Sequence, residues 1–444
     1  HQQIAKLCKF LIPPKKRVLD IGCGTGDLLV SISPNHGVGL DISENMVKIA
    51  QKKYPNLKFY AQDAQNLTIN ERFEYVILSD ILGDLEDIQK AFEELKKVSD
   101  EKTRIIITFY NYLWEPILTI GEKFGLKMRQ PIQNWLGKKD VENILNLAGL
   151  EVIKSGKYLL FPTYIPFISN IVNTYIARLP IVRDFCLVNY FIVRKNPNFY
   201  PDKEYSVSVV IPARNEAGNI EDAVIRTPKL GKSTELIFVE GHSKDSTKEE
   251  IRRVMEKYKN KKNILLVDQG KGKGKADAVR RGFEKATGEI LIILDADLTV
   301  APEELQKFYQ LLRTNKSEFV SGSRLVYPLE KDAMRFLNKL GNKFFSLIFT
   351  WLLDQEVKDT LCGTKALFRS DYNLISANRS YFGDFDPFGD FDLMFGASKL
   401  NLKMSEIPIR YKARAYGATN ISRFTHGWLL LKMTFFAAKK LKFV

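Results

Sequence analysis

The chain is poor in the residues that cross-link proteins or bind soft metals. Its 444 residues include only four cysteines and four histidines. The cysteines, Cys8, Cys23, Cys186 and Cys362, are scattered without a paired spacing, which excludes a disulfide framework and a zinc knuckle as organising features. We therefore expect the protein to work in a reducing, cytoplasmic setting.

Long runs without charge are also scarce. The longest, residues 158–177, is about long enough to span a bilayer, but Pro162, Pro166, Asn170 and Asn173 interrupt it. We interpret this run as an interfacial or buried segment rather than a membrane span. No signal peptide is expected at the start of the chain.

Positive charge is what the sequence has in excess. Lysine and arginine number 67 against 52 acidic residues, a formal net charge of +15, within a composition that is 45% hydrophobic and typical of a folded protein. A basic surface attracts nucleic acid, phosphorylated sugars and anionic lipid headgroups alike. Because the sequence lacks the stripe of aromatic and basic residues that stacks on bases, we expect no nucleic-acid partner.

The order of apolar runs divides the chain into two α/β domains. Between residues 17 and 195, short apolar runs alternate with helical patterns. This alternation predicts a doubly wound, mostly parallel sheet whose last two strands form an antiparallel pair. A polar stretch with prolines then predicts a linker at 197–204. A second strand-and-helix series follows, so we assign the domains to residues 1–196 and 205–444.

A glycine turn marks the start of the first domain. In VLDIGCGTGDLL, a strand runs into Gly22, Gly24 and Gly26, which let the backbone approach a ligand, and the next helix offers free N–H groups. The G-x-G-x-G spacing differs from the G-x-G-x-x-G of dinucleotide-binding folds. The next two strands end in VGLDIS, with Asp41, and YAQDAQNL, with Asp63. Carboxylates at these places can accept hydrogen bonds from ribose hydroxyls and from an adenine amine.

Together these residues resemble a class I S-adenosylmethionine-dependent methyltransferase, over roughly residues 1–195. The resemblance implies a Rossmann-like sheet and S-adenosyl-L-methionine as cofactor. It places Asp20 and the three glycines around the methionine moiety, Asp41 on the ribose and Asp63 beside the adenine. The methyl acceptor stays open, because no side chain stands out as a base and Asp80 after the fourth strand is only a suggestion. A domain that binds the cofactor without turnover is the alternative.

An acidic doublet follows the apolar run of EILIILDADL, residues 289–298. We interpret the run as a buried strand, in which residues two apart project to one side, so Asp295 and Asp297 point into one space. Two like charges there need a cation, and carboxylate oxygens favour Mg²⁺ or Mn²⁺. Such an ion, bridging a diphosphate, stabilises a departing nucleoside diphosphate.

Other motifs surround this doublet in a definite order. SVVIPARNEAGNI and ELIFVEGHSKDST precede it, and GSR, DTLCGTKALFR, GDFDLMFGA, EIPIRYKAR and YGATN follow it. This order resembles a glycosyltransferase family 2 domain of the GT-A fold, and more closely its dolichyl-phosphate mannose synthase branch, over roughly residues 205–426. Two departures leave the nucleotide open: VEGHS replaces the more usual V-D-D-G-S, and Thr299 stands where the branch often has Gln.

The resemblance also implies roles for single residues. The nucleotide-sugar donor would be held by Pro212, Arg214, Glu216, Glu240, Lys275, Asp295 and Arg414, and the metal by Asp295 and Asp297. Arg324 and Arg335 match the arginines that receive the acceptor phosphate, whose dianion suits a planar guanidinium fork. Asp392 falls where relatives that glycosylate hydroxyls keep a catalytic base. With a phosphate acceptor, which is already an anion, it would orient the sugar or the metal instead.

We therefore predict a bifunctional enzyme: metal-dependent, inverting transfer of a sugar from a nucleotide-sugar to a polyprenyl phosphate, with methylation of a related glycan or lipid. Two apolar helices that carry lysines, 334–353 and 428–444, are expected to pack in the core or to give peripheral contact with the inner face of a membrane. One alternative makes the acceptor a sugar hydroxyl with Asp392 as base. Another, supported by net charge alone, is a nucleic-acid-binding methyltransferase with a docking domain.

Overall fold

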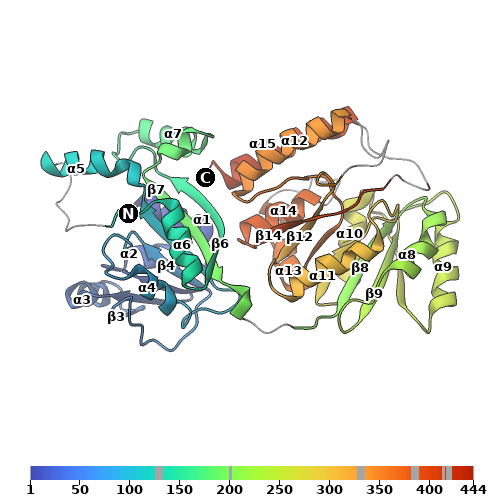
Figure 1. Cartoon of the computed structure of the whole chain (residues 1–444), viewed down its shortest axis with the longest axis horizontal. Coiled ribbons are helices and arrows are strands. Elements are labelled where there is room, and N and C mark those ends of the chain that lie inside the picture. The colour runs from blue at the N-terminus through green and yellow to red at the C-terminus, as the bar shows by residue number, and fades with distance from the viewer. Residues whose placement is uncertain are drawn as a thin grey trace. The chain divides into compact units, whose positions relative to one another are not determined.

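The computed structural model describes residues 2–125, 134–199, 203–327, 336–381, 390–412, 416 and 423–443. The chain forms two compact units, His1–Phe199 with Phe443–Val444, and Tyr200–Lys442. Each unit contains one seven-stranded sheet with helices packed against it (Figure 1). The α/β class predicted for both halves of the chain is confirmed.

The first sheet has the strand order β3-β2-β1-β4-β5-β7-β6. Its strands are β1 (Arg17–Ile21), β2 (His36–Asp41), β3 (Lys58–Ala61), β4 (Tyr75–Ser79), β5 (Arg104–Tyr110), β6 (Leu150–Tyr158) and β7 (Val188–Lys195). β7 runs antiparallel to both β5 and β6, whereas the pairs among β1 to β5 are parallel. The predicted antiparallel pair at the end of the domain is therefore confirmed.

Apolar side chains cover both faces of this sheet. Successive strand residues point to opposite faces, so Val76 joins one core cluster and Ile77 the other. Burial on both faces explains the unbroken apolar runs of the central strands. The helices are α1 (Gln2–Leu11), α2 (Asp27–Ser31), α3 (Glu44–Lys53), α4 (Ile88–Glu94), α5 (Glu115–Lys123), α6 (Lys138–Leu147) and α7 (Ile168–Thr174).

The uncharged run 158–177 lies between β6 and β7 and contains α7, a helix of only seven residues. Several of its large apolar side chains lie on the surface of the unit, among them Phe167, which is 84% exposed, and Tyr164, which is 79% exposed. These side chains are therefore not part of the buried core of the unit. Among the described residues, no helix is both long and apolar enough to cross a membrane.

The second sheet has the strand order β10-β9-β8-β11-β13-β12-β14. Its strands are β8 (Val207–Ala213), β9 (Thr234–Glu240), β10 (Asn263–Asp268), β11 (Ile290–Ile293), β12 (Phe319–Ser323), β13 (Lys365–Phe368) and β14 (Met404–Pro408). β13 runs antiparallel to its neighbours β11 and β12, and the other pairs are parallel. The strand order reverses between β8 and β11, as it does between β1 and β4, and ligands of open α/β sheets bind beyond the carboxyl ends at such a point.

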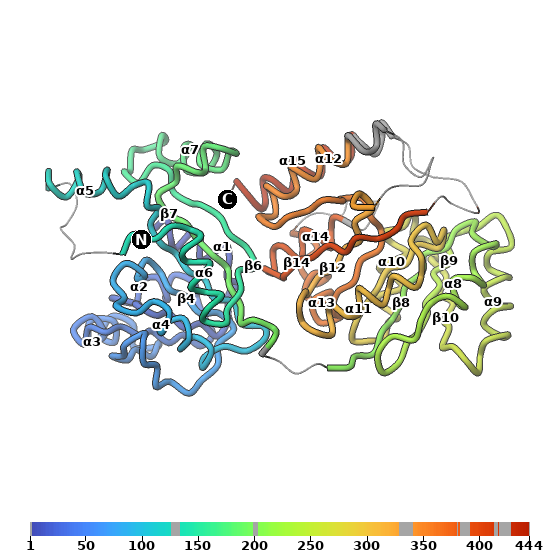
Figure 2. Tube along the Cα trace, viewed as in Figure 1, coloured from blue at the N-terminus to red at the C-terminus, as the bar shows by residue number. Residues whose placement is uncertain are grey.

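Eight helices are described in the second unit: α8 (Ile220–Arg226), α9 (Thr247–Tyr258), α10 (Gly274–Lys285), α11 (Leu305–Arg313), α12 (Phe336–Leu353), α13 (Arg369–Ala377), α14 (Asp390–Lys399) and α15 (Arg423–Leu441). α12 and α15 are far apart in the sequence but pack side by side, as the trace in Figure 2 shows. Both expected C-terminal helices therefore form, and they form one layer.

The acidic doublet does not lie in a strand. β11 ends at Ile293, two residues before Asp295, and the backbone N–H of Leu298 donates to the carbonyl of Asp295 at 3.2 Å. Asp295 and Asp297 thus belong to a turn after the strand. The argument that strand alternation projects both to the same side is wrong, because alternation holds only within extended backbone.

Candidate functional site

The glycine turn after β1 is held in a conformation that glycine adopts most readily. Gly22, Gly24 and Gly26 have φ values of 78°, 53° and 80°. A Cβ atom on Gly22 would lie 2.4 Å from Cγ2 of Ile81, whereas a Cβ on Gly24 would meet nothing within 4 Å. The turn therefore packs tightly at its start and borders open space at Gly24.

Asp41, at the end of β2, is tied to this turn. Its carboxylate accepts hydrogen bonds from the backbone N–H of Gly24 at 2.8 Å and of Ser43 at 2.9 Å. The structure thus brings Asp41 beside the glycine turn, as the predicted ligand site requires. Asp63, after β3, accepts from the backbone N–H of Gln65 at 2.9 Å, a contact within its own loop rather than with the glycine turn.

Asp20, the fourth residue of β1, is 1% exposed, and neither of its carboxylate oxygens has a hydrogen-bond partner. Burial, and secondly the charge of Asp41, raises the pKa of Asp20 to about 7. A buried carboxylate without donors is costly on its own. The arrangement therefore suits a ligand that brings a positive or hydrogen-bonding group to the end of β1.

The second site centres on Asp295. Lys275, near the N-terminus of α10, places Nζ 2.6 Å from Oδ1 of Asp295. Gly363 lies against this pair, since a Cβ there would be 2.1 Å from Nζ and 2.3 Å from Oδ2. Burial opposes ionisation of Asp295, but the charges of Lys275, Lys365 and Arg324 hold its pKa below the usual value. Asp295 therefore stays an anion among cations.

The other member of the doublet has a different neighbour. Oδ1 of Asp297 accepts from the hydroxyl of Thr299 at 2.9 Å and from its backbone N–H at 3.2 Å. Thr299, which replaces the expected Gln, therefore orients Asp297. Within the described parts of the chain, no three His, Cys, Asp or Glu side chains gather as a metal site would require.

The donor residues expected after β8 and β9 lie at the same edge of the sheet. Pro212 is half-buried within β8 and Arg214 is exposed just after it. Glu216 is buried, and one of its carboxylate oxygens accepts from the Asn219 side chain at 2.7 Å. Glu240 ends β9, is also buried, and accepts from the backbone N–H of Ser243 at 2.6 Å. Both glutamates therefore brace loops at this edge.

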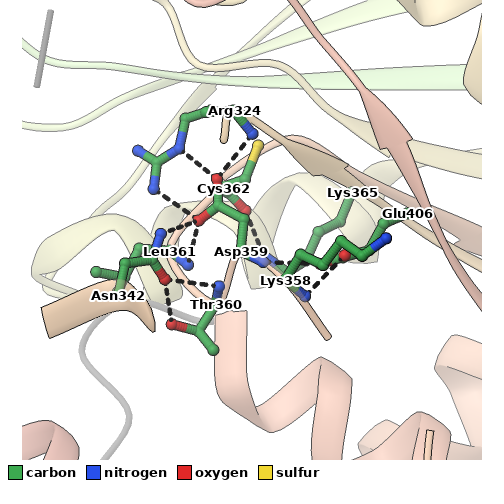
Figure 3. Close-up of polar contacts among 9 residues, drawn as sticks. All are labelled: Arg324, Asn342, Lys358, Asp359, Thr360, Leu361, Cys362, Lys365 and Glu406. Carbon is green, nitrogen blue, oxygen red and sulfur yellow. Dashed lines mark hydrogen bonds and ion pairs between the residues drawn. The ribbon is translucent and has the colours of Figure 1, made fainter. Parts of the chain in front are cut away.

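Arg324, directly after β12, forms an ion pair with Asp359, a residue for which the sequence predicts no role. Its Nε and Nη2 donate to the two oxygens of Asp359 at 2.7 and 2.8 Å, as Figure 3 shows. Asn342 of α12 donates to the same carboxylate at 2.8 Å. Asp359 is fully buried, and although burial opposes it, the bonds from Arg324 lower the pKa of Asp359. Sequence reasoning missed this buried counter-ion.

Glu406 of β14 supports the loop that carries Asp359. Its two oxygens accept the backbone N–H groups of Lys358 at 2.8 Å and Asp359 at 3.0 Å (Figure 3). Burial raises the pKa of Glu406 to about 7, although these two hydrogen bonds oppose the shift. Glu406 therefore acts on Arg324 only through Asp359.

Asp392, in α14, lies between two arginines that the sequence did not single out. Oδ2 of Asp392 accepts from Nη2 of Arg280 at 3.2 Å and from Nε of Arg379 at 2.9 Å. Asp392 is buried, and Arg280 lies on α10, the helix that begins beside Lys275. Arg335 and Arg414 lie outside the described residues.

Comparisons with known proteins give a family match within each unit. Residues 208–374 match the family model described as Glycosyl transferase family 2, and residues 12–149 match one described as Methyltransferase domain. The dolichol-phosphate mannosyltransferase of Pyrococcus furiosus is 30% identical over 220 residues, 48% of this chain and 59% of that protein. The dolichol-phosphate mannosyltransferase of Saccharomyces cerevisiae is 34% identical over 132 residues, 28% of this chain and 48% of that protein.

The chain therefore spans about half the length of these curated relatives. Among solved structures, an S-adenosylmethionine-dependent methyltransferase from Clostridium acetobutylicum superposes with a TM-score of 0.31 at 15% identity, over 44% of this chain and 89% of that chain. This likeness is too low to support an argument, so the assignment of both units depends on the family matches.

Proposed function

We propose that this chain is a bifunctional transferase, because residues 208–374 match glycosyl transferase family 2 and residues 12–149 match a methyltransferase family. One unit transfers a sugar, with inversion, from a nucleotide-sugar to a polyprenyl phosphate. The other uses S-adenosyl-L-methionine to methylate a related glycan or lipid. The similarity to two dolichol-phosphate mannosyltransferases supports a lipid phosphate as acceptor.

The observation that carries the glycosyl transfer is the cluster at the carboxyl end of β11. Asp295 lies 2.6 Å from Lys275, and the charges of Lys365 and Arg324 act on the same carboxylate. Lys275, Lys365 and Arg324 thus bring three positively charged side chains to the crevice where an open sheet binds its ligand. A departing nucleoside diphosphate gains negative charge, so these cations stabilise it.

The acidic doublet supplies donors that fit a hard divalent cation. Asp295 and Asp297 offer carboxylate oxygens within one turn, and such oxygens suit Mg²⁺ or Mn²⁺. These two residues would hold the ion, which would neutralise charge on the diphosphate. Lys275, already bonded to Asp295, would then shift toward the diphosphate or share the carboxylate with the ion.

Toward the acceptor, Arg324 is the proposed phosphate contact. Burial opposes its charge, but the pair with Asp359 raises the pKa of Arg324 above its usual value, so the guanidinium stays charged. A fixed, charged guanidinium suits a phosphate anion better than a mobile lysine would. A phosphate oxygen is already nucleophilic, so no general base is needed at this site.

Residues at the end of β1 support the proposed methyltransferase activity. Asp20 has no partner for either oxygen, and the space beside Gly24 is open. S-adenosyl-L-methionine carries an ammonium group on its methionine moiety, which would satisfy a buried carboxylate. We infer that Asp20 and the glycine turn hold this moiety and that Asp41, beside the turn, meets the ribose.

A lipid-linked acceptor also requires contact with a membrane. The α12–α15 layer exposes large apolar side chains, including Leu347 at 65%, Trp428 at 61% and Phe435 at 77%. Exposed lysines, Lys343 and Lys432, lie on the same helices. Apolar side chains next to lysines suit the interface of an anionic bilayer. We propose that this layer makes peripheral contact with the membrane.

A direct assay tests the glycosyl transfer. The full chain is incubated with radiolabelled nucleotide sugars, Mn²⁺ and a short-chain polyprenyl phosphate, and the products are extracted into organic solvent. We expect label in the organic phase from the native chain and about a hundredfold less from Asp295→Asn. Label that enters the organic phase equally with both proteins, or with neither at any donor, contradicts the proposal.

The methyltransferase half has a separate test, calorimetry with S-adenosyl-L-methionine. Binding is expected to the native chain, and a Gly24→Val variant, which strains the positive φ of the turn and places a side chain in the open space beside it, is expected to bind at least about tenfold more weakly. An absence of heat with the native chain contradicts this half alone.

A further inference from the structure

The proposed function leaves the methyl acceptor unassigned, and the candidate is a pocket at the carboxyl ends of β4 and β5. Asp80, Tyr110 and Trp135 line it, together with Leu82, Gly83, Phe109, Asn134 and Leu136. Asp80 is its one acidic residue, and the rings of Tyr110 and Trp135 lie 6.4 Å apart. The pocket thus combines one carboxylate with aromatic walls.

The pocket adjoins the glycine turn. β4 pairs with β1, with Ile21 opposite Leu78, and Ile81 packs against Gly22. A side chain that follows β4 is therefore next to the turn where the methyl donor is proposed to bind. Methyl transfer needs the acceptor beside the donor, because reacting atoms have to come within about 3–3.5 Å.

Asp80 is held in a conformation that its surroundings impose. Its φ is 56°, which is uncommon for a residue other than glycine, and such strain concentrates at functional sites. The Thr108 hydroxyl donates to Oδ1 of Asp80 at 2.8 Å, and the Asp80 N–H donates to the Thr108 carbonyl at 3.0 Å. Thr108 of β5 therefore orients one carboxylate oxygen of Asp80 and also holds the Asp80 backbone in place.

The size of the pocket selects what enters it. The pocket is small, with a volume of about 20 Å³. A whole sugar ring does not fit, but one hydroxyl of a ring does, with the ring itself against the aromatic side chains at the rim. Aromatic faces suit the apolar face of a sugar ring as they suit other flat apolar groups.

The chemistry favours a hydroxyl over an amine. A neutral amine attacks a methyl group without losing a proton first, whereas a hydroxyl is a weak nucleophile unless a base takes its proton. Burial raises the pKa of Asp80, against the hydrogen bond from Thr108, which makes the carboxylate a stronger base than an exposed aspartate. A base in a pocket of this size therefore favours a hydroxyl as the methyl acceptor.

We propose that Asp80 is the general base for O-methylation of a sugar hydroxyl in this pocket. The inference depends on the proposed methyltransferase activity. The hydroxyl proton passes to Asp80, the oxygen forms a bond to the methyl carbon of the sulfonium, and the carbon–sulfur bond breaks with its electron pair going to sulfur. The products are the methyl ether, S-adenosylhomocysteine and a proton that Asp80 releases to water. Thr108 is a positioning residue.

The test uses the full chain with tritiated S-adenosyl-L-methionine and, as probes, the octyl glycosides of glucose, mannose and galactose, with octylamine as the amine probe. We expect methyl ethers from at least one glycoside, and a fall of about a hundredfold or more in kcat for Asp80→Asn with little change in the binding of S-adenosyl-L-methionine. The matched control is Glu86→Gln, which alters an exposed acid on the same loop that does not line the pocket and which should keep the native rate.

Two further readouts separate catalysis from folding. Asp80→Glu should recover part of the rate lost in Asp80→Asn, and thermal unfolding identifies any variant that fails to fold. Thr108→Val removes a hydrogen bond that stabilises the carboxylate, so the rising limb of its pH–rate profile should move to higher pH.

Native rates in Asp80→Asn, label in octylamine rather than in a glycoside, or no labelled glycoside despite binding of S-adenosyl-L-methionine would each overturn the inference. Loss of S-adenosyl-L-methionine binding by the native chain would instead contradict the proposed function itself.

Discussion

Arg324 and Asp359 form a two-point ion pair inside the second unit, with Nε 2.7 Å and Nη2 2.8 Å from the two carboxylate oxygens. Asp359 is fully buried and Arg324 nearly so. Breaking such a pair from one side leaves a buried charge without its partner, at a cost of about 3–5 kcal/mol. The pair therefore contributes strongly to the local fold as well as fixing the guanidinium.

Asp359→Asn is expected to lower the free energy of unfolding by about 3 kcal/mol, because it leaves the Arg324 charge uncompensated. Urea denaturation measures the change. Glu356→Gln is the matched control, since Glu356 is an exposed carboxylate on the same loop, 3.4 Å from Lys358, and should change stability by less than about 0.5 kcal/mol. Equal stability of the two variants would show that the buried pair has no special role.

Arg324→Lys tests the phosphate contact. Lysine keeps the charge but cannot make both bonds to Asp359, so its position is less well fixed. We expect the KM for polyprenyl phosphate to rise about tenfold while the KM for the nucleotide-sugar stays within about twofold. A rise in the donor KM alone would place Arg324 at the donor instead. Initial rates at varied lipid and varied donor give both constants.

Lys275 is expected to serve the donor diphosphate, because its ammonium group lies 2.6 Å from Asp295. Lys275→Gln should weaken binding of a nucleoside diphosphate about tenfold and make binding depend more steeply on Mn²⁺, since the metal would then be the main remaining cation. Lys273→Gln, which alters an exposed lysine of the same loop, is the control. Calorimetry with and without Mn²⁺ measures both effects, and identical affinities for the two variants would remove Lys275 from the site.

Much of this architecture could be predicted from the sequence because it is locally encoded. Strands of buried β-branched residues, the glycine turn and the order of the motifs depend on short spacings, and the structure keeps them together. Asp41 reaches the glycine turn as expected, because the carboxyl ends of parallel strands meet at one edge of a sheet.

Long-range pairing was not predictable in the same way. The bond from Arg324 to Asp359 joins residues 35 positions apart, and no local pattern distinguishes a buried counter-ion from a surface acid. Arg280 and Arg379 meet at Asp392 for the same reason. The acidic doublet was wrongly placed in a strand because β11 stops at Ile293, while the apolar pattern continues through Leu294.

Asp20 predicts a dependence of stability on pH. Its pKa of about 7 lies above the ordinary aspartate value of 3.8, so the folded chain binds more protons than the unfolded chain between these values. Stability of the ligand-free protein should therefore fall by up to about 4 kcal/mol as pH rises from about 4 to 7, and it should stay low above that pH. Asp20→Asn should remove most of this slope and bind S-adenosyl-L-methionine about tenfold more weakly. Denaturant unfolding across this pH range tests the slope, and an unchanged slope contradicts the assignment.

The role of Asp392 distinguishes a phosphate from a hydroxyl as the group that accepts the transferred sugar. Because its Oδ2 already accepts bonds from Arg280 and Arg379, we expect Asp392 to hold these cations rather than remove a proton. Asp392→Asn should then lose stability by about 2–3 kcal/mol but keep at least about a tenth of the native turnover at low temperature. A loss of turnover beyond about a thousandfold in a folded variant would favour the hydroxyl-acceptor alternative, with Asp392 as base.

The α12–α15 layer should bind anionic membranes through its exposed apolar side chains. Phe435 and Leu347 are 77% and 65% exposed, and a charge at either place would oppose insertion into the lipid interface. Phe435→Glu with Leu347→Glu should reduce flotation with anionic liposomes about tenfold while leaving the unfolding midpoint unchanged. Ile225→Glu, on α8 and 54% exposed, alters the same kind of side chain outside the layer and should float like the native chain. If all three proteins float equally, the layer is not the contact. Residual flotation of the double variant that declines with salt would assign the remaining attraction to the lysines of α12 and α15.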